Sequence, residues 1–227
     1  MTYSTFDMFQ WMDAEAASAF QEAAFRRDYA AGQVIYLQGD HGQEMFRLVS
    51  GSVRMSVSRS DGREIVHAFF EPGDCFGDSS MVDFGPRPQT AEAHTDIVVD
   101  VIDMSNFVRL RDAHRTFGDA MLKLLARQMR AACMYFEEAS LDDMSARVAR
   151  RILDATRSFG TDADGGKRLS LRLPQADIAH MVGASRQSVN KVLQRFQCEG
   201  LITIEYGNIL VHDLEGIRRA VGCELPS

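Results

Sequence analysis

The chain has 227 residues and a formal net charge of −7 at pH 7, and 45% of its residues are hydrophobic. This composition is typical of a globular protein with a buried core, and the length suits one large domain or two small ones. No apolar run approaches the roughly 18 residues of a membrane-spanning helix, so no membrane span is expected. The N-terminus shows no basic region followed by an apolar stretch, so no secretory signal is predicted, and we expect a cytoplasmic protein.

Charge is divided unevenly along the chain. Residues 1–144 carry 13 basic and 23 acidic side chains, a balance of −10, whereas residues 145–227 carry 12 and 9, a balance of +3. Such asymmetry places any nucleic-acid surface in the C-terminal part. Because +3 is a modest excess, we expect weak non-specific binding that depends strongly on salt.

The first 100 residues change from a helical pattern to a strand pattern. Residues 1–25 predict a helix, because Phe6, Phe9 and Phe20 belong to an apolar series with steps of three or four. From Tyr29 to about Val101 the chain shows short alternating segments separated by regularly spaced glycines, which are Gly32, Gly39, Gly51, Gly62 and Gly73. Short strands with regular turns are typical of a β-sandwich or barrel.

A long helix is predicted from about Thr116 to Ala139, after a short helix capped by Ser105. Its apolar residues form two lines. The first has the spacing of a coiled-coil seam and consists of Leu122, Leu125, Met129, Ala132 and Phe136. The second, which consists of Phe117, Met121, Leu124 and Tyr135, suits packing on the β domain. Two lines need two partners, which indicates a two-fold dimer through the first line; the alternative is a helix buried wholly within one chain.

An acidic connection, residues 140–145, marks the predicted domain boundary. Asp142 or Asp143 is placed to cap a helix that runs to Gly160. Residues 161–167 are rich in turn-forming residues and predict a loop, and the alternation of residues 168–173 predicts a strand.

Residues 174–200 predict a helix-turn-helix. Pro174 suits the first turn of one helix, and Gly183 suits a sharp turn with positive φ. Ser185 is a good N-cap for a second helix, which Gly200 ends. Small or apolar residues stand wherever the two helices would touch: Ile178, Ala179, Val182, Val189 and Val192. The alternative is an ordinary helical hairpin.

The exposed side of the second helix suits a DNA major groove. Arg pairs well with guanine, and Gln or Asn pairs well with adenine, whereas short hydroxyl residues suit phosphates. No acidic residue lies between Ser185 and Gln197. The predicted DNA-binding residues are Ser185, Arg186, Gln187, Ser188, Asn190 and Lys191. A β-hairpin around Gly207 would add a wing, and residues 215–222 predict a final turn or two of helix.

Four motifs resemble the CRP/FNR family of bacterial transcription regulators. They are Gly32-x6-Gly39-Asp40, Phe46-Arg-Leu-Val-Ser-Gly51, Pro72-Gly-Asp-Cys-Phe-Gly-Asp78 and Val182-Gly-Ala-Ser-Arg-Gln-Ser-Val189. The resemblance implies an α+β fold: a cyclic-nucleotide-binding-like β-roll (jelly-roll) sensor domain with an N-terminal helix over residues 1–115, a dimerisation helix over 116–140, and a winged helix-turn-helix domain over 141–227. It also implies a homodimer that binds a palindromic double-stranded DNA operator, responds to an effector in the β-roll, and alters recruitment of RNA polymerase.

The effector pocket implied by this resemblance departs from the cyclic-AMP pattern. Family members that bind cyclic AMP carry F-G-E-x-A-L and then R-[ST]-A, where this chain has Phe76-Gly-Asp-Ser-Ser-Met81 and Arg87-Pro-Gln89. Arg87 still suits a phosphate, but Asp78 is one methylene shorter than the family's Glu and Pro88 has no N–H to donate. The candidate ligand-binding residues are Gly77, Asp78, Ser79, Ser80, Arg87 and Pro88. We predict that cyclic AMP is not a strong effector; the alternative is a degenerate pocket with a solvated Arg87.

Other sensor chemistries are constrained by the cysteines, which are Cys75, Cys133, Cys198 and Cys223. None is close to another, so neither a zinc knuckle nor a redox CxxC pair is predicted. The iron–sulfur members of the family carry an N-terminal cysteine cluster, and here no cysteine precedes Cys75. A core cysteine is favoured over an oxidation sensor at Cys75, and haem held by other ligands remains an open alternative. The sequence leaves open whether Cys133 is redox-active, and it predicts no metal site.

The competing class is a cyclic-nucleotide-type binding module that acts through protein partners rather than DNA. It would need a different effector domain, whereas residues 145–227 match a DNA-binding head. An enzyme is not predicted, because the chain has no P-loop, GxSxG or HExxH motif, and no catalytic residues are proposed. The effector, the operator, the target genes and the choice between activation and repression are left open by the sequence.

Overall fold

A computed structural model describes residues 4–205 and 208–222. The chain divides into two compact units, one of residues 1–63 and 67–132 and one of residues 64–66 and 133–227. The longest helix, α4 (Arg115–Leu141), begins in the first unit, and its last turns belong to the second. The predicted turn at Gly207, the first three residues of the predicted N-terminal helix and Cys223 lie outside the described residues.

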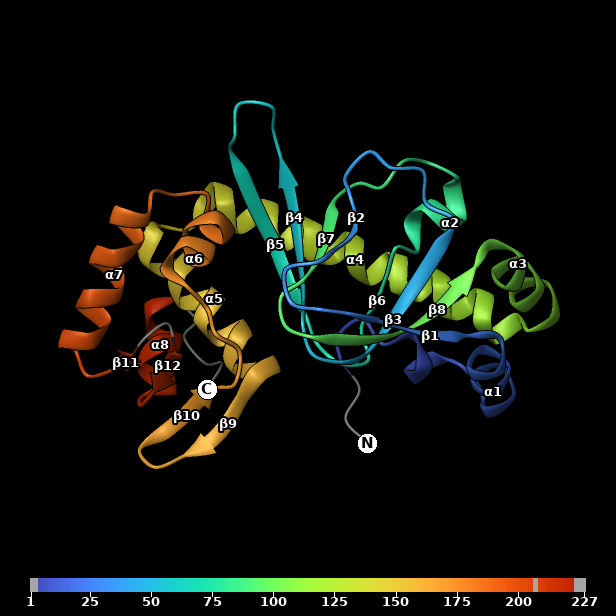
Figure 1. The fold of residues 1–227 in the computed structure, drawn as a ribbon. Coiled ribbons are helices and arrows are strands. Elements are labelled where there is room, and N and C mark those ends of the chain that lie inside the picture. Colours follow the sequence, from blue (N-terminus) through green and yellow to red (C-terminus); the bar gives the residue numbers. More distant parts are fainter. Residues whose placement is uncertain (1–3, 206–207, 223–227) are drawn as a thin grey trace. The chain divides into compact units, whose positions relative to one another are not determined.

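The first unit contains two four-stranded antiparallel sheets, which agrees with the sandwich of the two predicted alternatives, sandwich and barrel (Figure 1, blue to green). Their strand orders are β1-β8-β3-β6 and β2-β7-β4-β5. Alternating side chains such as Leu48, Val53 and Val99 are fully buried in one core between them. The strands are β1 (Phe25–Tyr29), β2 (Val34–Tyr36), β3 (Glu44–Ser50), β4 (Val53–Ser58), β5 (Glu64–Phe70), β6 (Cys75–Phe76), β7 (Thr90–Ala93) and β8 (Ile97–Asp103).

The N-terminal segment corrects the prediction of one helix over residues 1–25. It forms a 3₁₀ turn, η1 (Met8–Trp11), then α1 (Ala14–Ala23), and β1 begins at Phe25. The break occurs because Asp7 and Asp13 each cap the element that follows. Their side chains accept hydrogen bonds from the backbone N–H groups of Phe9 and Ala16, respectively. An aspartate also replaces the predicted cap Ser105: Asp103 caps α3 (Met104–Ala113).

The first part of α4 packs on the β unit through one of its two predicted apolar lines. Phe117, Met121 and Leu124 are at most 4% exposed and join the core that contains Phe20 and Phe107. At about 100° per residue, the predicted seam lies on a different side of the helix. That side is uncovered in the single chain, where Leu122, Met129 and Phe136 are 68%, 63% and 74% exposed, Ala132 is exposed and Leu125 is half-buried.

The second unit carries the helix-turn-helix between two hairpins (Figure 1, orange to red). Its helices are α5 (Met144–Phe159), α6 (Gln175–Val182), α7 (Arg186–Cys198) and α8 (Leu214–Ala220). Its sheet has the order β11-β12-β10-β9, from β9 (Gly160–Ala163), β10 (Gly166–Leu169), β11 (Ile202–Glu205) and β12 (Asn208–Val211). The β11–β12 pair confirms the predicted wing, and Asp143 is the cap of α5.

The β9–β10 hairpin corrects the predictions for residues 161–173. The expected loop contains strand β9, and the expected strand over 168–173 ends at Leu169. Leu171 and Leu173 are nevertheless buried. The alternating pattern therefore predicted the burial of these side chains correctly, but it predicted strand pairing wrongly. Pairing stops there because β10 has β9 and β12 as neighbours for only a few residues.

Candidate DNA-binding surface and effector pocket

The helix-turn-helix has the local geometry that the sequence predicts. Gly183 turns the chain in the left-handed region at φ +62°, and Gly200 follows α7 at φ +71°. The Ser185 Oγ accepts from the backbone N–H of Ser188 at 3.1 Å and so caps α7. The apolar sides of the two helices are buried, in particular Ile178, Ala179, Val182, Val189, Leu193 and Phe196.

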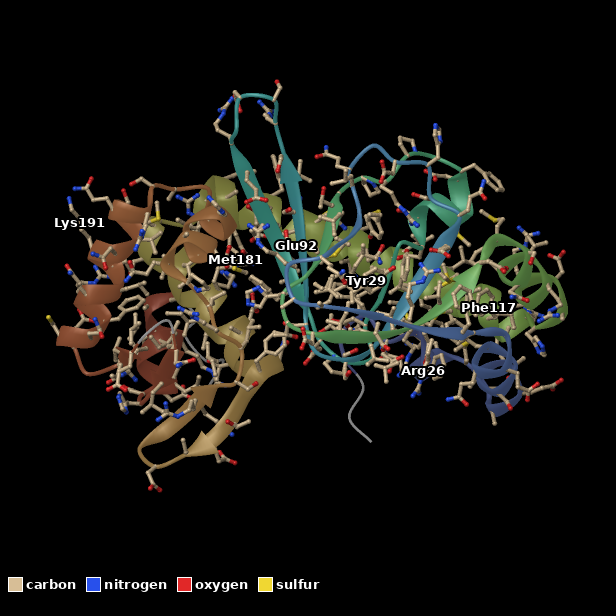
Figure 2. The ribbon with its side chains drawn as sticks, in the orientation of Figure 1. Arg26, Tyr29, Glu92, Phe117, Met181 and Lys191 are labelled. Carbon is tan, nitrogen blue, oxygen red and sulfur yellow. The ribbon has the colours of Figure 1, made fainter. Side chains whose placement is uncertain are left out.

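The polar side of α7 is open to solvent. Ser185, Arg186, Gln187, Ser188 and Lys191 are all exposed, and Lys191 is labelled on α7 in Figure 2. The described chain therefore presents Arg and Gln side chains on the first turn of a capped helix. That is the position from which a recognition helix reaches base edges in the major groove.

The structure changes the predicted set of DNA-binding residues at two positions, Asn190 and Gln194. Asn190 is half-buried, and its Oδ1 accepts from the Gln175 Nε2 of α6 at 3.1 Å, so the protein already uses one of its recognition atoms. Gln194 is exposed seven residues, about two turns, after Gln187, and it lies on the same side of α7. Sequence reasoning missed Gln194, although the seven-residue spacing from Gln187 was a signal that could have found it.

Arg87 lies inside the first unit and is only 3% exposed, so the alternative of a solvated loop residue is wrong. Its two terminal nitrogens each donate to a backbone carbonyl at 2.6 Å, those of Gly77 and Glu44. Its guanidinium carbon lies 4.3 Å from the centroid of the Tyr36 ring. Among the described residues, the Arg87 Nε has no partner. The guanidinium is thus a buried, incompletely satisfied cation in a cradle of backbone oxygens.

Asp78 is the matching buried acid, at 2% exposed. Its Oδ1 accepts from the Gln128 Nε2 of α4 at 3.1 Å, whereas its Oδ2 has no partner in the described chain, and neither does the Oγ of Ser80. Burial raises the pKa of Asp78 above its ordinary value of 3.8, against the opposing influence of Gln128 and Arg87. Buried polar atoms are almost always satisfied in folded proteins, so these orphan atoms mark a site for a ligand or ordered water.

The remaining pocket candidates lie along the same loop and on α2 (Ser79–Asp83). Gly77 adopts φ +76°, and a Cβ there would lie 2.7 Å from an Arg87 nitrogen, so glycine is required beside the cradle. Ser79 is half-buried, and Pro88 is exposed. These buried groups therefore supply one cation, one short acid and one hydroxyl, a set that fits a ligand with an anionic group and a hydroxyl.

Cys75 does not have the surroundings of an oxidation sensor. It is fully buried, and burial raises the pKa of its thiol far above the ordinary value, which disfavours the reactive thiolate. The favoured interpretation, a core cysteine, is confirmed. In residues 4–205 and 208–222 there is no group of three or more His, Cys, Asp or Glu that could hold a metal ion, and no helix is long and apolar enough to cross a membrane.

Comparison with known proteins matches both units. Residues 26–114 match the cyclic nucleotide-binding domain, and residues 146–220 match the Crp-like helix-turn-helix domain. A CRP-like cAMP-activated global transcriptional regulator of Mycobacterium tuberculosis is 31% identical over 219 residues, 93% of this chain and 95% of the relative. The transcriptional regulator LdrP of Thermus thermophilus is 32% identical over 199 residues, 87% of this chain and 97% of the relative.

Solved structures of regulators also resemble this chain. A CRP-family transcriptional regulator from Thermus thermophilus superposes with a TM-score of 0.74 at 29% identity, covering 88% of this chain and 98% of that one. FixK2 from Bradyrhizobium japonicum, at 22% identity, shares the fold with a TM-score of 0.78 over 89% of this chain and 99% of its own. The fold and the capped recognition helix define a DNA-binding transcription regulator with an effector-binding domain, and not an enzyme. The chain belongs to the CRP/FNR family.

Proposed function

We propose that this regulator works as a homodimer, that α7 of each copy reads one half of a palindromic operator, and that a ligand in the first unit controls binding. The observation that carries the proposal is the first turn of α7. Arg186 and Gln187 stand exposed there on a helix capped by Ser185, with no acidic side chain until after Gln197. Arg suits guanine and Gln suits adenine, whereas Ser185 and Ser188 suit the phosphates on either side.

The uncovered seam of α4 supports the homodimer. Leu122, Met129 and Phe136 expose large apolar side chains at heptad spacing, which a second copy of the same helix would bury as knobs into holes. A two-fold axis along α4 presents two copies of α7. The half-sites should then lie about one helical turn apart, about 34 Å between the recognition helices.

The pocket atoms support an effector with an anionic group and a hydroxyl. Arg87 would pair with the anion through its free Nε, and the Oδ2 of Asp78 would accept from the hydroxyl. Relatives named as cAMP-activated favour a cyclic nucleotide. The short acid at Asp78 and the missing N–H donor at Pro88 still predict weak binding of cyclic AMP itself.

The same reasoning favours RNA polymerase as the protein partner and the cytoplasm as the location, because both follow from regulated transcription in a bacterial cell. A module that acts through other proteins and not through DNA is not favoured, since the described residues of the second unit form a winged helix-turn-helix.

A binding selection on randomised double-stranded DNA tests the proposal. The purified full-length protein should enrich one palindromic sequence with half-sites one turn apart, and sedimentation should show a dimer. Enrichment of no common sequence, or of a single unrepeated half-site by a monomer, would contradict it.

A further inference from the structure

Tyr135 joins the last turns of α4 to the helix-turn-helix by one hydrogen bond. Its hydroxyl donates to the backbone carbonyl of Met181, 3.1 Å away. Met181, labelled in Figure 2, lies in the last turn of α6, where carbonyls have no partner within the helix, and it is 6% exposed. The hydroxyl therefore satisfies a partly buried acceptor just before Gly183, the residue that turns the chain into α7.

A partly buried ion cluster holds the same turns of α4 against α5. Glu138, one turn after Tyr135, pairs with Arg151, and the Arg150 Nε lies 3.2 Å from its other oxygen. Arg150 also reaches Asp142 at 3.0 Å. The Arg151 guanidinium lies 5.9 Å from the centroid of the Tyr135 ring, within cation–π range. Burial raises the pKa of Glu138 against the opposing influence of Arg151 and Arg150.

The two sets of contacts act at different distances from the joint between α4 and α5. That joint is short, because α4 ends at Leu141 and α5 begins at Met144. The Glu138 and Asp142 pairs lie close to it. Tyr135 lies six residues before the end of α4, about 9 Å along the axis at about 1.5 Å per residue. A contact farther from a joint limits rotation about it more strongly, so the Tyr135 hydroxyl is well placed to limit that rotation.

We infer that Tyr135 is a positioning residue that sets the angle of the helix-turn-helix against the last turns of α4, and with it the half-site spacing that the dimer accepts. This inference rests on the proposed function, in which the α4 seam joins two copies and each α7 binds one half-site. In such a dimer a small change of angle at each joint moves the two recognition helices apart or together, whereas the contacts of one α7 with one half-site stay the same.

The test compares the wild-type protein with Tyr135→Phe, which removes only the hydroxyl. Tyr29→Phe is the matched control, because it makes the same change on β1 in the first unit. Affinity is measured for the selected operator, for versions with the spacer one base pair longer or shorter, and for a single half-site, and thermal unfolding is followed for all three proteins. In Tyr135→Phe we expect the preference for the best spacer over its neighbours to fall about three- to tenfold, as for the loss of one hydrogen bond, with half-site affinity unchanged. Tyr29→Phe should keep the wild-type preference.

The outcomes separate the two claims. A wild-type protein without any spacer preference contradicts the proposed dimeric function. A wild-type preference that Tyr135→Phe retains overturns the inference. So does a variant whose half-site affinity and melting temperature fall while its spacer ratios stay the same, because that pattern is a loss of stability and not of positioning.

Discussion

Asp78→Asn should make the protein more stable, even though it alters a buried, hydrogen-bonded residue. Asp78 is 2% exposed, and among the described residues only one of its oxygens has a partner, the Gln128 side chain at 3.1 Å. A buried acceptor left unsatisfied costs about 1–3 kcal/mol, and more when it is charged. Asparagine keeps an oxygen for Gln128 and replaces the unpartnered charged oxygen with an uncharged NH2 group, which costs less to bury than a carboxylate. We expect a gain of about 1–3 kcal/mol at pH 8, or roughly 2–12 °C in Tm for a chain of this size.

The pH dependence gives the sign of the effect. Because burial raises the pKa of Asp78 above 3.8, the folded protein holds its proton at pH values where the unfolded chain has lost it. Its contribution to stability therefore falls as pH rises from about 4 through the raised pKa. Arg87, Tyr36 and Cys75 lie within electrostatic range of the carboxylate, and all three keep their charge state over this interval. The difference between Asp78→Asn and wild type should be small near pH 4 and grow toward pH 8.

Asp74 supplies a matched control with the opposite expectation. Burial raises its pKa as well, but its two oxygens accept from the backbone N–H groups of Phe6 and Glu71 at 2.8 and 2.9 Å. Asp74→Asn has one acceptor oxygen for two donors, so it should lose stability at pH 8. Fluorescence of Trp11, the only tryptophan, follows unfolding of the first unit. The reasoning fails if Asp78→Asn is no more stable than wild type at pH 8, or if the difference between them does not change with pH.

Three further predictions concern the dimer, the effector and the operator. Leu125→Asp places a charge in the middle of the α4 seam and should yield monomers in sedimentation, so an unchanged dimer would rule out that interface. Two lost hydrogen bonds of about 1–3 kcal/mol each should weaken cyclic AMP binding tens- to ten-thousand-fold relative to a site that makes both bonds, and calorimetry that measures low-micromolar affinity would contradict this. Arg186→Ala should cost about 1–3 kcal/mol and relax the preference at one base pair of each half-site, whereas Ser188→Ala should weaken binding similarly on all sequences. An identical operator logo for wild type and Arg186→Ala would show that Arg186 does not read a base.

Local chemistry made much of the second unit predictable. The φ of +62° at Gly183, the Ser185 cap and the Asp143 cap each depend on a few neighbouring residues, and all three agree with the sequence. The exposed apolar line of α4 was predictable for the same reason, because its heptad spacing is a property of one helix. Where several local signals competed, the prediction was wrong: Asp7 and Asp13 broke a segment that apolar spacing alone predicted as one helix.

Only the tertiary structure shows which charged and polar side chains are buried and which groups they bind. A sequence shows that Arg87 and Asp78 are charged, but not that both are buried, that Arg87 turns onto two carbonyls, or that Gln128 reaches the acid from 50 residues away. The same holds for Tyr135, which was predicted to lie on the β domain and instead donates to Met181 in the second unit. Helical and strand periods depend on residues that are neighbours along the chain. Each of these contacts instead joins segments that are distant in the sequence. Such a contact stabilises the protein only after folding has closed the loop between its two segments.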